Sequence, residues 1–215
     1  MSYWLTKSKY IMGLQCEKAL WMSVYKPRWA YYPPETLALF RQGRMFEASF
    51  KSTFPDGVDI CAKLGRRVSE YPQLTRQLLD SEGPITLFEA GFEYGGVLVL
   101  ADVVCKYADG TVEVYEVKNG TEEKKVFQDD IAIQHYVIWH CIPRLAHFYL
   151  LYNDGEGGFL KRDFFEQSLA SHEQTERAVN RFNEVLRREE PAIPMGVQCE
   201  KPYSCPFRRY CLRGS

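Results

Sequence analysis

The fold is decided by an apolar run, Val97-Leu-Val-Leu-Ala-Asp-Val-Val-Cys105, and by the run that follows it, Val112-Glu-Val-Tyr-Glu-Val-Lys118. The first run is apolar at nearly every position, which is typical of a central strand covered on both faces. A lone buried carboxylate is costly, so Asp102 in this run needs a partner. In the second run Glu116 and Lys118 lie two residues apart, so their side chains point to the same face of the sheet.

The loop between these two strands determines whether Asp102 meets Glu116. A two-residue turn at Asp109-Gly110 would pair Asp102 with Val117 and place Glu116 on the opposite face. A three-residue loop from Ala108 to Gly110, with the glycine in the left-handed conformation, pairs Asp102 directly with Glu116. The hypothesis of a shared site therefore requires the three-residue loop.

Two carboxylates that face each other on a sheet repel, so this register indicates a cation between Asp102 and Glu116. Hard oxygen ligands select Mg²⁺ or Mn²⁺, which keeps several waters and binds substrate phosphate. Lys118 beside such an ion can orient the attacking water and favour its deprotonated form. The chemistry indicated is phosphodiester hydrolysis. The alternative is a surface Glu/Lys pair in an ordinary sheet, because the tripeptide E-x-K is common.

The rest of the 215-residue chain reads as an α/β domain with a mixed central sheet flanked by helices. Periodicity and turn residues predict helices over Glu35–Ser52, Tyr71–Asp80, Val126–Cys141 and Gln167–Arg188, and strands over Val58–Leu64, Thr86–Tyr94, Val97–Cys105, Val112–Lys118, Ala146–Tyr152 and Gly158–Phe164. No apolar run is long enough to span a membrane, and the first residues lack the apolar segment of a signal peptide. We therefore expect a cytoplasmic protein.

A net charge of −1 gives no basic field over the whole molecule, so nucleic acid must be contacted through local clusters. Pairs of basic residues occur at Arg41/Arg44, Arg66/Arg67, Lys124/Lys125, Arg187/Arg188 and Arg208/Arg209. Aromatic residues near the first pair, Tyr31, Tyr32 and Phe40, could stack on bases, but packing in the core is the default expectation.

The seven cysteines divide into two sets. Three of them, Cys61, Cys105 and Cys141, lie singly in apolar stretches and read as buried thiols. The other four are Cys16, Cys199, Cys205 and Cys211. The last three follow the spacing C-x5-C-x5-C, which lacks the close pairs common in zinc fingers. Iron-sulfur clusters also take four thiolates, and Cys16 is the natural fourth ligand. Zinc, or free thiols in a disordered tail, are the alternatives.

Three short motifs together resemble the PD-(D/E)XK nucleases of the RecB type. They are Leu100-Ala-Asp102, Tyr115-Glu-Val-Lys118 and Asp130-Ile-Ala-Ile-Gln134-His-Tyr136. With the terminal cysteines, the chain resembles the iron-sulfur branch, which includes the CRISPR-associated Cas-four exonucleases and the AddB-type helicase-nucleases. The start of the chain, Lys7-Ser-Lys-Tyr10 through Cys16, also looks like that of stand-alone Cas-four-like proteins.

The resemblance implies a set of site residues. Asp102, Glu116 and the Val117 carbonyl would bind the metal, Lys118 would be the catalytic lysine, and Gln134 would face the sheet. The family's tyrosine has no clear counterpart, because Tyr136 lies about 200° around the helix from that position.

An early motif departs from the family as well. Cas-four-type enzymes carry a histidine ligand after a glycine, whereas here Gly43-Arg-Met-Phe-Glu47 offers Glu47 as the metal ligand. Glu89 on the preceding strand is a candidate to support the ligands. The four histidines, His135, His140, His147 and His172, match no motif and read as structural.

The resemblance implies a restriction-endonuclease-like fold and a Mg²⁺- or Mn²⁺-dependent exonuclease acting on single-stranded DNA, with a structural 4Fe-4S cluster. Residues 35–190 would form the PD-(D/E)XK core, and residues 1–34 and 191–215 would join at the cluster, all within one nuclease domain of residues 1–215. Proteins of CRISPR adaptation or of DNA repair are the implied partners. The competing interpretation is a non-catalytic iron-sulfur module that binds DNA as an adaptor.

Overall fold

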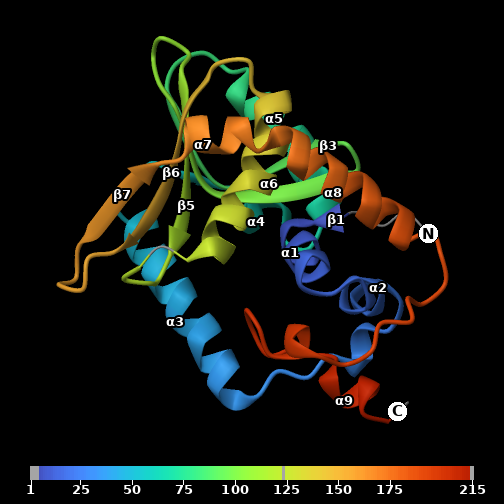
Figure 1. Ribbon diagram of the computed structural model, residues 1–215. Coiled ribbons are helices and arrows are strands. Elements are labelled where there is room, and N and C mark those ends of the chain that lie inside the picture. The colour runs from blue at the N-terminus through green and yellow to red at the C-terminus, as the bar shows by residue number, and fades with distance from the viewer. Residues whose placement is uncertain (1–4, 123, 214–215) are drawn as a thin grey trace.

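A computed structural model describes residues 5–122 and 124–213, and these residues form a mixed seven-stranded sheet with helices on both faces (Figure 1). The strands are β1 (Leu5–Thr6), β2 (Val58–Asp59), β3 (Ile85–Tyr94), β4 (Val97–Lys106), β5 (Val112–Lys118), β6 (Leu145–Asn153) and β7 (Phe159–Asp163). They follow one another in the order β2-β3-β4-β5-β6-β7, and β1 pairs with the start of β4. The β1–β4, β2–β3 and β5–β6 pairs are parallel, and the others are antiparallel. The predicted α/β class with a mixed sheet is confirmed.

Helices cover both faces of this sheet. They are α1 (Lys7–Gln15), α2 (Glu17–Tyr25), α3 (Pro34–Lys51), α4 (Ile60–Leu64), α5 (Tyr71–Leu79), α6 (Lys125–Cys141), α7 (Phe165–Ala170), α8 (His172–Val185) and α9 (Arg208–Cys211), with 3-10 turns η1 (Pro27–Trp29), η2 (Val68–Glu70) and η3 (Val197–Cys199). Helix α6 packs with α1 and α8 over the larger core, and the end of α3 covers a smaller core on the other face (Figure 1). In the described part of the chain, no helix combines the length and the apolar character that a membrane crossing requires.

The β4–β5 hairpin has the register that the site hypothesis required. Val104 pairs with Val114 and Val103 with Tyr115, where the ladder ends, and the same register one residue further sets Asp102 opposite Glu116. Beyond the strand ends the Tyr107 amide donates to the Thr111 carbonyl at 2.9 Å, which leaves a three-residue loop whose last residue, Gly110, has a φ of +81°. A glycine tolerates this left-handed conformation without the steric cost that a Cβ would bring. The prediction made from the loop length is therefore confirmed.

Two predicted elements are wrong. The predicted strand Val58–Leu64 stops after Asp59, because the Asp59 side chain accepts a hydrogen bond from the Ala62 amide at 2.9 Å and caps helix α4. The predicted helix Gln167–Arg188 is two helices, α7 and α8, separated at Ser171. The Ser171 hydroxyl donates to the Ser168 carbonyl at 2.7 Å, and this local bond competes with helix continuation.

The side-chain alternation of β3 and β4 changes phase in the middle of both strands. On β4, Val99 and Ala101 pack in the larger core, but so does Val104, while Val103 packs in the smaller core on the other face. The change falls at Asp102 and Glu89, where the β3–β4 ladder is interrupted between the pairs Phe88–Val103 and Ala90–Ala101. Glu89 has a φ of +52°, which is strained for a residue with a side chain. This irregularity turns the two carboxylates away from the regular pleat.

Candidate active site

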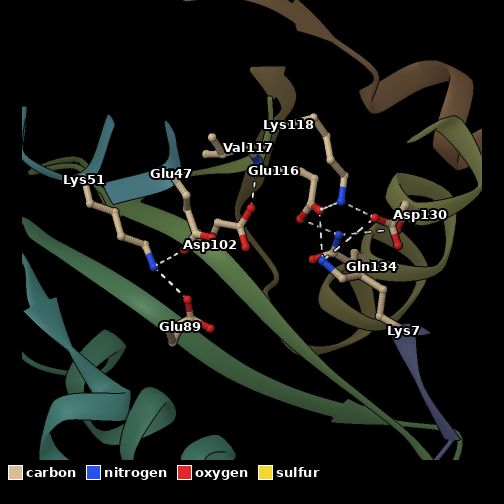
Figure 2. Close-up of polar contacts among 10 residues, drawn as sticks. All are labelled: Lys7, Glu47, Lys51, Glu89, Asp102, Glu116, Val117, Lys118, Asp130 and Gln134. Carbon is tan, nitrogen blue, oxygen red and sulfur yellow. Dashed lines mark hydrogen bonds and ion pairs between the residues drawn. The ribbon is translucent and has the colours of Figure 1, made fainter. Parts of the chain in front are cut away.

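Three carboxylates from three elements meet at the phase change, and we call them the acid group: Glu47, Glu89 and Asp102. Glu47 comes from α3, Glu89 from β3 and Asp102 from β4, and their oxygens all lie within 4.8 Å of one another (Figure 2). Lys51, one helical turn after Glu47, pairs with Glu47 and reaches Glu89 at 2.7 Å. Among the residues that the structure describes, this is the one set of three or more His, Cys, Asp or Glu compact enough to share a metal ion.

Asp102 is the most buried member of the acid group, with 9% of its surface exposed. Its carboxylate accepts a hydrogen bond from the Val117 amide at 2.7 Å. The side chain thus replaces a backbone acceptor just beyond the last pair of the β4–β5 ladder, Val103–Tyr115. Burial raises the pKa of Asp102 well above its usual range, and the neighbouring charge of Glu116 adds to this effect. Burial also raises the pKa of Glu89, although Lys51 opposes the shift. One lysine, Lys51, therefore faces three carboxylates and does not neutralise them all.

Glu116 lies beside the acid group but has a different environment, which we call the paired group: Lys7, Glu116, Lys118, Asp130 and Gln134 (Figure 2). One oxygen of Glu116, Oε1, receives the ammonium groups of Lys7 at 2.9 Å and of Lys118 at 2.5 Å. The other oxygen, Oε2, accepts a hydrogen bond from the Gln134 amide at 2.6 Å. Burial would raise the pKa of Glu116, but Lys118 and Lys7 outweigh it and hold the pKa below its usual range.

Asp130 completes the paired group. It lies on α6 one turn before Gln134, is 8% exposed, and pairs with Lys118. Lys7 lies 4.0 Å from the same Asp130 oxygen. Burial would lower the pKa of Lys118, but Glu116 and Asp130 raise it well above its ordinary value. Both lysines are therefore charged.

Sequence reasoning assigned no role to Lys7 or Asp130. Asp130 left a usable signal, because positions i and i+4 share a helix face and Gln134 was already assigned to the sheet. Lys7 left none: it is 109 residues from Glu116 in sequence, and the two-residue strand β1 that positions it is too short to show a period.

The structure places the predicted residues as follows. Asp102, Glu116, Lys118, Gln134 and Glu47 lie together around the β4–β5 hairpin (Figure 2). The backbone register sets Asp102 opposite Glu116 as predicted, but the two carboxylates belong to different groups. Gln134 is fully buried and faces the sheet as predicted, and its Oε1 has no hydrogen-bond partner among the described residues. Tyr136 packs against Tyr94 instead, outside the site.

The charges of the site do not cancel. The residues drawn in Figure 2 include five carboxylates and three lysine ammonium groups, which leaves a formal charge of −2 when all are ionised. Such a surplus inside a protein is costly unless protons or cations neutralise it. The surplus equals the charge of one divalent cation. The buried Gln134 Oε1 also lacks a hydrogen-bond donor among the described residues.

The four terminal cysteines line one small cavity between the N-terminal helices and the C-terminal tail. The cavity is lined by Cys16, Cys199, Cys205 and Cys211, together with apolar residues such as Met22 and Phe207. Burial raises the pKa of the Cys205 thiol to about 11. Within the described residues, no three of these sulfurs lie within 4.8 Å of one another. We call this place the cysteine cavity.

Comparison with known proteins finds a distant structural similarity and no family. No family model matches the chain. No curated protein matches it either. Among solved structures, the chain is similar to the one titled "Crystal structure of SSO0001", at 12% sequence identity and a TM-score of 0.45, over 96% of this chain and 84% of that chain.

Proposed function

We propose that this chain is a metal-dependent deoxyribonuclease of the PD-(D/E)XK type that hydrolyses phosphodiester bonds. The observation that carries the proposal is the hairpin register, which sets Asp102 opposite Glu116 and brings Lys118 and Gln134 to the same place. Carboxylates from neighbouring strands, a lysine and a helix amide are the parts that metal-assisted hydrolysis of a phosphodiester needs.

Asp102, Glu116 and Glu47, with the Val117 carbonyl, would hold a Mg²⁺ or Mn²⁺ ion, and Glu89 would support them. The formal surplus of two negative charges and the high pKa of Asp102 fit these residues to a divalent cation. When bound, the ion supplies Lewis-acid stabilisation of the phosphoryl oxygens and a water of lowered pKa. Lys118 would orient the attacking water, while Asp130 holds the lysine and Gln134 holds Glu116.

Single-stranded DNA is the substrate that we propose, because exposed aromatic rings lie beside basic residues at the start of α3. Tyr31, Tyr32 and Phe40 are 41%, 39% and 47% exposed, so the expectation that they pack in the core is wrong. The Arg209 guanidinium lies 3.3 Å from the centre of the Tyr31 ring. Aromatic rings beside cations bind unpaired strands by stacking on bases and neutralising phosphates.

Degradation of labelled DNA in Mn²⁺ tests the proposed function. We expect the wild type to shorten a single-stranded oligonucleotide and Lys118→Met to be slower by about 10² to 10⁴-fold, the range for a group that acts in proton transfer. The matched control is Lys63→Met, since Lys63 is an exposed residue of the short helix α4 and belongs to none of the basic pairs named above. Both variants remove one lysine charge, and only the first removes it from the site.

Two outcomes contradict the nuclease. One is a wild type that binds the oligonucleotide, measured by fluorescence anisotropy, without degrading it, which is the behaviour of an adaptor module. The other is equal degradation by the wild type and Lys118→Met, which indicates a contaminant. A 5′ label and a 3′ label on parallel samples give the polarity of the exonuclease.

We propose that the cysteine cavity holds a structural 4Fe-4S cluster. Four thiols from both ends of the chain line it. In any three of them at least one pair of sulfurs lies more than 4.8 Å apart, whereas four Zn–S bonds of about 2.3 Å bring sulfurs to roughly 3.8 Å from one another. Helix α1 carries Lys7 at its first residue and is followed directly by Cys16, so one short helix spans from the paired group to the cavity. The cluster would anchor that helix.

Anaerobic purification tests the cluster. We expect a brown protein with iron and sulfide bound, and loss of the visible absorbance in Cys205→Ala but not in Cys61→Ala, whose thiol is exposed and distant in sequence. A colourless protein that contains zinc contradicts the proposal.

A further inference from the structure

Glu116 is contacted by two lysines on a single oxygen. Lys7 Nζ lies 2.9 Å and Lys118 Nζ 2.5 Å from Glu116 Oε1 (Figure 2). Glu116 is 1% exposed, so this charge is neutralised by protein groups rather than by water. A carboxylate oxygen with two ammonium groups is already fully neutralised, and a divalent cation can bind there only if a lysine withdraws.

The two lysines are not held equally. Lys118 has a second strong partner in Asp130, whereas Lys7 is 4.0 Å from the nearer Asp130 oxygen. The exposed fractions of the two side chains, 21% for Lys7 and 22% for Lys118, are alike, so the ion pairs alone distinguish the two lysines. Of the two ammonium groups, that of Lys7 therefore leaves Glu116 at the smaller cost.

The backbone keeps Lys7 at the site after its ammonium leaves Glu116. Leu5 pairs with Val97 in the parallel β1–β4 ladder, and the Thr6 hydroxyl accepts from the Lys9 amide at 3.4 Å, which caps α1. A lysine reaches several ångströms from a fixed backbone, so a small rotation of this side chain moves its charge toward the solvent side of Glu116.

We propose that Lys7 is an exchangeable counter-ion: it neutralises Glu116 in the metal-free protein, and it moves to a phosphate oxygen of the DNA strand when a divalent cation takes Glu116. The inference rests on the proposed nuclease function and adds a residue to it. An ammonium group placed on the reacting phosphate stabilises the charge that develops there. The same lysine prevents an uncompensated negative charge when the site holds no metal.

Lys7→Met separates this role from a structural one, because it predicts opposite changes in two measurements. Without DNA, Lys7→Met should bind Mn²⁺ about three- to tenfold more tightly than the wild type, measured by the loss of the free-ion EPR signal, since removing one competing ion pair is worth about 1 kcal/mol. At saturating Mn²⁺, its single-turnover cleavage of single-stranded DNA should be about 10²-fold slower. Lys7→Arg should recover most of the cleavage rate.

The control is again Lys63→Met, which should match the wild type in both measurements. Weaker or unchanged Mn²⁺ binding by Lys7→Met overturns the inference, and so does cleavage at the wild-type rate. If Lys7 merely supported the fold, its replacement by methionine would lower both the Mn²⁺ affinity and the thermal stability. Failure of the proposed function appears differently, because then the wild type itself does not cleave DNA.

Discussion

The acid group and the paired group lie side by side but solve the problem of buried charge in different ways. The acid group has three carboxylates and one lysine, Lys51, which pairs with two of them, Glu47 and Glu89. The paired group balances two carboxylates, Glu116 and Asp130, with two lysines and adds the Gln134 amide. The negative surplus therefore lies in the acid group, while the paired group is close to neutral. The comparison teaches that neighbouring buried carboxylates can differ in charge balance: the acid group has a formal negative surplus, and the paired group does not.

The difference arises from one backbone irregularity. In regular strands, Glu89, Asp102 and Glu116 lie in line across β3, β4 and β5, and alternation would treat them alike. The positive φ of Glu89 shifts the phase of both β3 and β4, and Asp102 turns to accept from the Val117 amide. Only Glu116 stays on the face of α6, where Gln134 meets it.

Replacing Asp102 should have the largest effect on activity. Asp102→Asn keeps an acceptor for the Val117 amide but removes a charge that would hold the cation, so we expect cleavage to fall on the order of 10³-fold. The folded pKa of Asp102 is raised above its unfolded value, so its ionisation at neutral pH costs stability. The asparagine variant should therefore be as stable as the wild type or more stable by about 1 kcal/mol in EDTA.

Urea unfolding of the metal-free protein and a cleavage assay check this together. A variant that loses activity and also several kcal/mol of stability would indicate a folding defect. Asp109→Asn is the matched control: it makes the same chemical change in the exposed loop of the same hairpin, and we expect wild-type cleavage from it.

The hairpin was predictable from sequence because its information is local. The loop length from Ala108 to Gly110 fixes the register, and the register fixes which residue faces Glu116. The helix face of Gln134 followed in the same way from a period within α6. These parts depend only on residues that are near one another in the chain.

The partition of charges was not predictable, because it depends on contacts between distant segments. Lys7 enters through the short parallel β1–β4 pairing, and Lys51 reaches Glu89 from another element, α3. The strained φ of Glu89 leaves no mark in the sequence, since nothing in the residue type favours it. The burial of Tyr31, Tyr32 and Phe40 was predicted wrongly for a related reason. An apolar residue in the sequence does not show whether another segment covers it.

Removal of Lys51 should have an intermediate effect, on stability rather than on chemistry. Burial would lower the pKa of Lys51, but Glu47 and Glu89 raise it, so below the ordinary lysine pKa its charge stabilises the fold as long as those carboxylates are ionised. In Lys51→Met, three carboxylates are left close together without a cation. We expect the metal-free variant to be less stable by about 1–3 kcal/mol at pH 8, measured by urea unfolding in EDTA.

The pH dependence sharpens this prediction. Because the pKa values of Asp102 and Glu89 are raised, these carboxylates take up protons first as the pH falls, and the repulsion that Lys51 relieves disappears. The deficit of Lys51→Met should therefore shrink between pH 8 and pH 5. A deficit that stays constant over this range would show that Lys51 contributes packing rather than charge, and the contrast between the two groups would be lost.

The smallest expected effect tests the irregularity itself, by comparing Glu89→Gly with Glu89→Ala. Both variants remove the carboxylate and its ion pair with Lys51, so their difference isolates the backbone. In an ordinary strand alanine is favoured over glycine by roughly 0.5–1 kcal/mol. At the φ of +52°, only alanine carries the steric strain of a Cβ, and the order should reverse, with glycine more stable by about 1 kcal/mol in EDTA. If alanine is the more stable, Glu89 is not strained, and the separation of Asp102 from Glu116 needs a different cause.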